Sequence, residues 1–174
     1  AYRSLTDPAV NRTARLACAW SGIACTVLFA IGFVVFARWL PFPSPNIPAE
    51  QLAHDIAANA TGIRIGVIFM IIGFGLFAPF VVGVALELRH TDGDHPALTY
   101  LQMVCGGGGS AILALSPMFF GILAYRAGSI PPTTTQALYD IGWFCFVMPY
   151  PLFSILLIAQ GGAMLRDSGS TPVL

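Results

Sequence analysis

Four side chains that bind metals in proteins lie within six residues near the middle of the chain: His90, Asp92, Asp94 and His95. Imidazole and carboxylate groups together form sites for zinc and other divalent ions. The same segment also has the composition of a short polar turn, because Asp and Gly provide turn geometry. Ligands so close together on a flexible loop seldom converge on one ion. The turn is therefore the favoured interpretation, and a membrane metalloenzyme is the minor alternative.

The remaining polar residues form no recognisable catalytic constellation. The apolar segments hold no Asp, Glu, Lys, Arg or His at mid-membrane depth, where ion pumps, proton-coupled carriers and haem enzymes place them. The chain also lacks a Gly-x-Ser-x-Gly elbow, a His-Glu-x-x-His motif and a phosphate-binding loop. We therefore assign no catalytic residue and predict no cofactor, and the balance favours a protein that is not an enzyme.

A run of four glycines, Gly106, Gly107, Gly108 and Gly109, interrupts the third apolar segment. Four residues exceed one helical turn, so side chains are missing around the whole circumference of the helix. Each glycine lowers helix propensity by about 1 kcal/mol relative to Ala, which calls for a reason. Close packing of neighbouring helices is the favoured reason, and a bare backbone surface for a lipid tail or cofactor is the alternative.

Two prolines, Pro117 and Pro149, are expected at similar depths in the third and fourth spans, where each would bend its helix. Two bends at one level would open a gap between these helices. The residues expected to line this gap are Met118, Phe119, Phe120, Phe146 and Tyr150. Together with the glycine run they form the predicted binding site for an apolar molecule, such as a lipid, quinone or hydrocarbon.

The composition predicts that these residues lie in a membrane. Of the 174 residues, 56% are apolar and 9% are charged, and the mean hydropathy is +0.77. Four windows, 17–40, 65–86, 97–124 and 138–165, reach the length of about 20 apolar residues that a membrane helix needs. We predict an all-α integral membrane bundle of four transmembrane helices, folded as a single domain over residues 1–174. The formal net charge of zero argues against nucleic acid as a partner.

The segments at the ends of the spans predict further local structure. Residues 48–59 are expected to form a short amphipathic helix in the first outer loop, with Leu52 and Ile56 on its apolar face. Thr133 and Gln136 have the spacing of a capping box at the start of the fourth helix. Trp39 is expected to anchor the first span at the membrane interface. Gln102, inside the third span, would need a partner on another helix.

The arginines indicate the orientation of the chain. Five of the eight lie in the amino-terminal lead, the second loop and the tail, and three lie on the other side. The positive-inside rule then places both termini in the cytoplasm and makes this a multi-pass protein of the cell membrane.

Three short segments carry a resemblance to a known group of proteins. They are Ile-Arg-Ile-Gly at 63–66, Thr-Gln-Ala-Leu-Tyr-Asp-Ile-Gly-Trp at 135–143 and Val-Met-Pro-Tyr-Pro at 147–151. Across residues 47–167 the chain resembles a family of uncharacterised actinobacterial multi-pass membrane proteins. The resemblance implies further spans beyond the present chain, and it transfers no catalytic residue.

Three functions are compatible with these observations. The leading hypothesis is a non-enzymatic membrane subunit that packs against other membrane proteins, or against copies of itself, through small-residue helix faces. The second is a binder or carrier of an apolar small molecule in the glycine, Met and Phe region. The third is the metalloenzyme that would use the segment from His90 to His95. Membrane lipid is an expected partner in each case.

Overall fold

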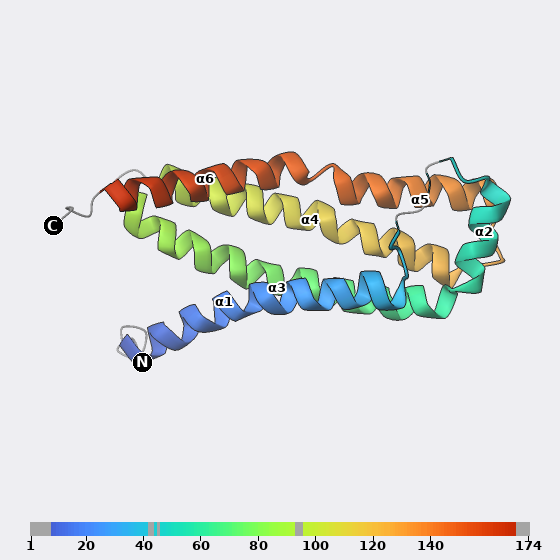
Figure 1. Cartoon of the computed structure of the whole chain (residues 1–174), viewed down its shortest axis with the longest axis horizontal. Coiled ribbons are helices and arrows are strands. Elements are labelled where there is room, and N and C mark those ends of the chain that lie inside the picture. The colour runs from blue at the N-terminus through green and yellow to red at the C-terminus, as the bar shows by residue number, and fades with distance from the viewer. Residues whose placement is uncertain (1–7, 42–43, 45, 93–95, 170–174) are drawn as a thin grey trace. The chain divides into compact units, whose positions relative to one another are not determined.

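The computed structural model describes residues 8–41, 44, 46–92 and 96–169, and it is all-α (Figure 1). The helices are α1 (Pro8–Ala30), the π-helix η2 (Ile31–Phe36), α2 (Ala49–Ala58), α3 (Ala60–Asp92), α4 (Ala97–Tyr125), α5 (Pro132–Val147) and α6 (Tyr150–Gly169). Within the described residues, four segments are long and apolar enough to cross a membrane: Arg12–Phe36, Ala60–Arg89, Ala97–Tyr125 and Pro132–Gly162. The prediction of an all-α protein with four membrane-spanning segments is confirmed.

Helix α3 is longer than the second predicted span. It begins at Ala60, directly after α2, and it continues to Asp92. The first part of the polar turn expected over His90 to His95 is therefore helical, up to Asp92, because nothing before the Asp-Gly pair interrupts the helical backbone pattern.

The chain divides into two compact units, and each of the four spans contributes a segment to both. Unit 1 contains the described residues up to Ala24, Leu76–Ser110 and those from Tyr150 onward. Unit 2 contains Cys25–Gly75 and Ala111–Pro149.

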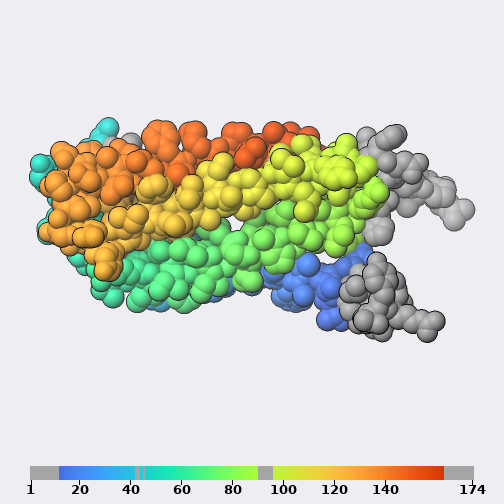
Figure 2. Space-filling view, turned by 180° about the vertical axis from the view of Figure 1, so that it is seen from behind, coloured from blue at the N-terminus to red at the C-terminus, as the bar shows by residue number. Residues whose placement is uncertain are grey.

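Small residues and aromatic rings hold unit 1 together. A Cβ atom added to Gly83 of α3 would lie 2.6 Å from the Cβ atom of Cys18, so α1 and α3 approach closely there. Phe77 of α3 and Phe153 of α6 form an edge-to-face pair with ring centroids 5.7 Å apart. Figure 2 shows the unit 1 part of α4, in yellow-green, between α3 and α6.

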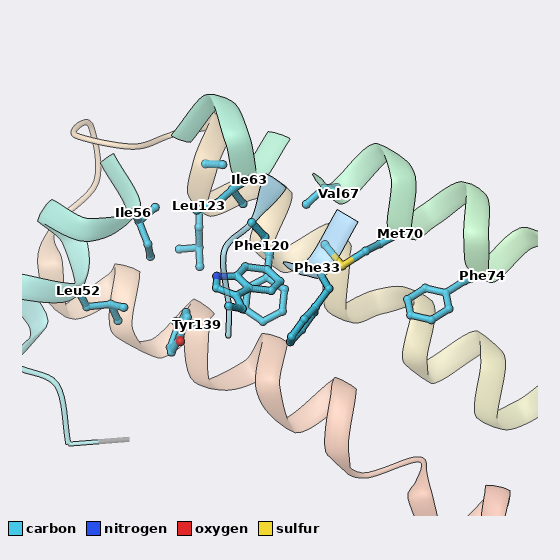
Figure 3. Packing of buried hydrophobic residues seen from close by; sticks show 13 residues of the cluster. Phe33, Leu52, Ile56, Ile63, Val67, Met70, Phe74, Phe120, Leu123 and Tyr139 are labelled. Atoms are coloured by element: carbon cyan, nitrogen blue, oxygen red, sulfur yellow. The ribbon is translucent and has the colours of Figure 1, made fainter. Parts of the chain in front are cut away.

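The core of unit 2 is an apolar cluster that draws on every helix of the unit (Figure 3). Helix α2 packs against α5 and places Leu52 and Ile56 in this cluster, which confirms the predicted amphipathic helix. The aromatic members interlock, with the rings of Trp39 and Phe120 only 4.3 Å apart. Trp39 is 6% exposed, so the expectation that it anchors the membrane interface was wrong.

Helices η2 and α3 meet backbone to backbone inside unit 2. A Cβ atom at Gly32 would lie 2.5 Å from the carbonyl oxygen of Gly66, and a Cβ atom at Gly66 would lie 2.5 Å from the carbonyl oxygen of Gly32. Gly62 lies one turn before Gly66, so α3 presents a Gly-x-x-x-Gly face to the first span. The crossing therefore depends on the absence of side chains on both helices.

The fourth helix differs from the sequence prediction. It is divided at Pro149 between α5 and α6, whereas α3 and α4 continue as helices through Pro79 and Pro117. The capping box was also wrong. Helix α5 begins at Pro132, so Thr133 is already helical, and Pro131 occupies the N-cap position without a side-chain bond. Proline favours the first helical turn because its missing N–H group is not needed there.

Candidate functional site

The proposed metal ligands lie outside the described side chains. His90 and Asp92 belong to the last turn of α3, but their side chains are not described, and Asp94 and His95 fall wholly outside the described residues. Among the side chains that the structure does describe, no three His, Cys, Asp or Glu residues form a group that could hold a metal ion. The metal site stays a prediction.

The glycine run has two different faces. A Cβ atom at Gly106 would lie 2.7 Å from Val81 of α3, and one at Gly109 would lie 3.1 Å from the ring of Phe153 of α6. A Cβ atom at Gly107 or Gly108 would meet no atom within 4 Å. Two glycines therefore allow α3 and α6 to approach α4 within unit 1. The other two have no such role in the described chain.

The other predicted ligand residues are placed as follows. In unit 2, Phe120 is buried and Phe146 is partly buried, and their rings lie 5.7 Å and 5.6 Å from the ring of Trp143. Phe119 is partly buried, and Met118 of the same unit is 54% exposed. Tyr150 belongs to unit 1 together with the glycine run, and it is 54% exposed. Unit 2 thus brings Phe120 and Phe146 together in one aromatic cluster, and the ligand-binding role stays a prediction.

Gln102 has the interhelical partner that its position in the third span called for. Its Oε1 atom accepts a hydrogen bond of 3.1 Å from Nε2 of Gln160 on α6. The Gln102 side chain is 0% exposed, and its own Nε2 group has no partner among the described atoms. This pair couples α4 to α6 inside unit 1.

Unit 2 contains a cavity that is lined by none of the predicted ligand residues. It has a volume of about 240 Å³ and lies beneath α2, where Leu52, Ile56 and Ile63 provide an apolar wall. The Tyr139 side chain of α5 also lines it, and Arg38 and Asp55 are at its border. In Figure 3, Tyr139 lies on α5 opposite Leu52 of α2. The sequence signal that could have revealed it is a Tyr on the same helical face as Thr135 and Gly142, both of which are buried.

The chain was compared with models of known protein families, with curated proteins and with solved structures, and none of the three comparisons gives a match. The fold and the positions of these side chains define the class, a multi-pass α-helical membrane protein. The resemblance to the actinobacterial family stays an expectation.

Proposed function

We propose that this chain is a non-enzymatic subunit of a larger membrane assembly. Its partner is a transmembrane helix, from another membrane protein or from a second copy of the chain, that packs on the face of α4 around Gly107 and Gly108. The observation that carries this proposal is the open space at these two positions. Glycine occupies both positions although no described neighbour within the unit requires it.

The energetic argument starts from the cost of glycine in a helix. Each glycine costs about 1 kcal/mol relative to Ala in helix propensity. At Gly106 and Gly109 close packing against Val81 and Phe153 offsets that cost. At Gly107 and Gly108 no described neighbour does so. Helix association in lipid relies on close packing at small residues, so an external helix is the natural source of the compensating contacts.

The surroundings of the glycine pair are suited to such a contact. Met103 and Val104 lie one turn before Gly107 and Gly108, and they are 43% and 71% exposed. Exposed apolar side chains beside a bare stretch of backbone offer a surface against which another helix can pack closely. These two side chains and the two glycines define the proposed helix-docking face.

The experiment is a pair of leucine substitutions with a matched control. Gly107→Leu combined with Gly108→Leu should abolish the stoichiometric partner, or the self-associated state, that the wild-type chain keeps in mild detergent. Thermal stability should hold or rise, because Leu is a better helix former than Gly. Quantitative mass spectrometry and two-colour energy transfer between labelled copies measure the two kinds of association.

The control is Gly75→Leu, on α3. Gly75 is also exposed, and a Cβ atom there would likewise meet nothing within 4 Å. This variant should keep the assembly intact. Unchanged association in the α4 double variant, or equal loss in both variants, would contradict the proposed docking face.

We further propose that the protein resides in the cell membrane with both termini in the cytoplasm. The support is the distribution of arginines between the two sides, five against three. Arg38, Arg64 and Arg126, the three assigned to the outer side, all belong to unit 2.

A further inference from the structure

Two residues of opposite formal charge border the cavity beneath α2 and form no ion pair with each other. Arg38 follows η2, Asp55 lies on α2, and both line the cavity. Arg38 is exposed and makes no hydrogen bond or ion pair with a described residue. Asp55 lies 3.5 Å from Nδ1 of His54, and 54% of its side chain is exposed. The border of the cavity thus offers one cation and one anion to a bound molecule.

The backbone at Arg38 is an unusual place for a residue with a side chain. Its φ angle is 56°, and it is the one described residue other than glycine with a positive φ. Glycine is the residue that this conformation favours after a helix end. Asn59 holds the segment by donating to the carbonyl oxygens of Phe36 and Ala37, and Ala37 and Trp39 are buried on either side of Arg38. Strained residues that their surroundings fix in this way cluster at ligand-binding sites.

The interior of the cavity is apolar and small. Leu52, Ile56 and Ile63 form its wall, and all three are buried. A cavity of about 150 Å³ holds a benzene molecule. In proportion, the cavity of about 240 Å³ holds about ten non-hydrogen atoms. This volume is sufficient for one apolar side chain and two small charged groups.

We propose that the cavity binds a free apolar α-amino acid of the size of leucine or methionine. The apolar side chain of the ligand lies against Leu52, Ile56 and Ile63. Arg38 binds the carboxylate, to which its planar guanidinium can donate two parallel hydrogen bonds, and Asp55 accepts from the ammonium group.

The charges at the border favour this class of ligand over others. A simple anion would be repelled by Asp55 and a simple cation by Arg38, whereas a zwitterion pairs with both. An α-amino acid carries both charges on the carbon atom that bears the side chain, so one border can bind them. In a phospholipid, glycerol separates the charges from the acyl chains, which exceeds the volume. The site does not use Gly107 or Gly108, so it stands independently of the proposed helix-docking face.

The test measures equilibrium binding of tritium-labelled leucine to the protein in nanodiscs of phosphatidylglycerol, which has no ammonium group. Leucine should bind saturably, beyond its retention by empty nanodiscs. Methionine should compete with it. Glycine, which lacks an apolar side chain, should compete about tenfold more weakly. Tryptophan, which exceeds the volume of the cavity, should not compete.

Two substitutions assign the charged groups. Asp55→Asn and Arg38→Gly should each weaken leucine binding about tenfold, as expected for the loss of one charge-assisted hydrogen bond. Asp55→Asn should not weaken competition by 4-methylpentanoic acid, which lacks the ammonium group. Arg38→Gly should not weaken competition by isopentylamine, which lacks the carboxylate. Thermal unfolding should show that Arg38→Gly keeps the fold, because glycine adopts a positive φ without steric cost.

The matched controls are Glu50→Gln on α2 and Arg126→Gln after α4. Both residues are exposed and neither lines the cavity, so both variants should bind leucine as the wild type does. Absence of saturable binding to the wild type would overturn the proposal, as would unchanged leucine affinity in Asp55→Asn and Arg38→Gly. Displacement of leucine by phosphatidylethanolamine added to the nanodiscs would also overturn it, because the occupant would then be a lipid headgroup.

Discussion

Neighbouring glycines of α4 differ in their surroundings, and a third case is found where η2 crosses α3. Side chains of other helices fill the space beside Gly106 and Gly109, whereas Gly107 and Gly108 face open space. Gly32 and Gly66 are under the strongest constraint, because each would place a Cβ atom against the other's carbonyl oxygen. A backbone oxygen cannot move aside as the end of a flexible side chain can, so these two positions tolerate no side chain without a shift of a whole helix.

Gly66→Ala should therefore destabilise the protein by about 1–3 kcal/mol, the range for overpacking in a well-packed interior. The control is Gly75→Ala on the same helix, where a Cβ atom meets nothing within 4 Å. That variant should be neutral or stabilise by up to about 1 kcal/mol through helix propensity. Denaturant unfolding in detergent measures both. A loss of stability in Gly75→Ala equal to that in Gly66→Ala would contradict the steric explanation.

At the scale of the elements, side chains from one helix complete the ends of another. The Arg64 guanidinium on α3 donates two hydrogen bonds, of 3.0 Å and 2.8 Å, to the carbonyl oxygen of Ala124 in the last turn of α4. A cation at a helix C-terminus is favourable because the last carbonyls lack partners within the helix. Asn59 acts similarly, since its Nδ2 group donates to the carbonyl oxygens of Phe36 and Ala37 at 3.1 Å each.

Arg64→Met should destabilise the protein by about 1–2 kcal/mol, because it leaves the carbonyl of the fully buried Ala124 without its donors. Arg64→Lys should recover only part of this loss, since an ammonium group cannot reproduce the two parallel N–H groups. Thermal unfolding of the wild type, Arg64→Lys and Arg64→Met measures the order of their stabilities.

The matched control is Arg126→Met. Arg126 is exposed, and its guanidinium carbon lies 5.9 Å from the centre of the Tyr125 ring. This substitution should change stability by less than about 0.5 kcal/mol, as is usual for surface positions. If it proved as costly as Arg64→Met, overall positive charge rather than the helix-end contact would explain both results.

At the scale of the whole molecule, burial within the described chain is low. Only 22%, 28%, 33% and 17% of the most apolar windows of the four spans is buried. In water such an apolar surface would drive aggregation, whereas in a bilayer it faces lipid or another membrane protein. The folded state of this chain therefore depends on its surroundings as well as on its own core.

The proposed orientation can be tested with single cysteines, in a chain whose four native cysteines are replaced by alanine. Ser44→Cys and Ala97→Cys place thiols at exposed positions, before α2 and at the start of α4. A membrane-impermeant maleimide added to intact cells should label Ser44→Cys and not Ala97→Cys, and permeabilised cells should show both. Labelling of Ala97→Cys alone in intact cells would reverse the assigned orientation.

The sequence by itself determined the class of fold, the approximate spans, the amphipathic helix with Leu52 and Ile56, and the need of Gln102 for a partner. These features depend on residue type and periodicity along one helix, and on the length of apolar sequence that a membrane requires. A comparison of residues within one segment is sufficient to find them.

Only the tertiary structure decided which glycines are packed, that Trp39 is buried, and that Tyr139 lines a cavity. It also decided that Arg64 completes the end of α4. Each of these depends on which residue of a distant segment faces the position, and spacing along one helix carries no information about that. Proline is the intermediate case. Its missing N–H group is visible in the sequence, yet packing decided that α3 and α4 continue through Pro79 and Pro117 while the fourth span is divided at Pro149.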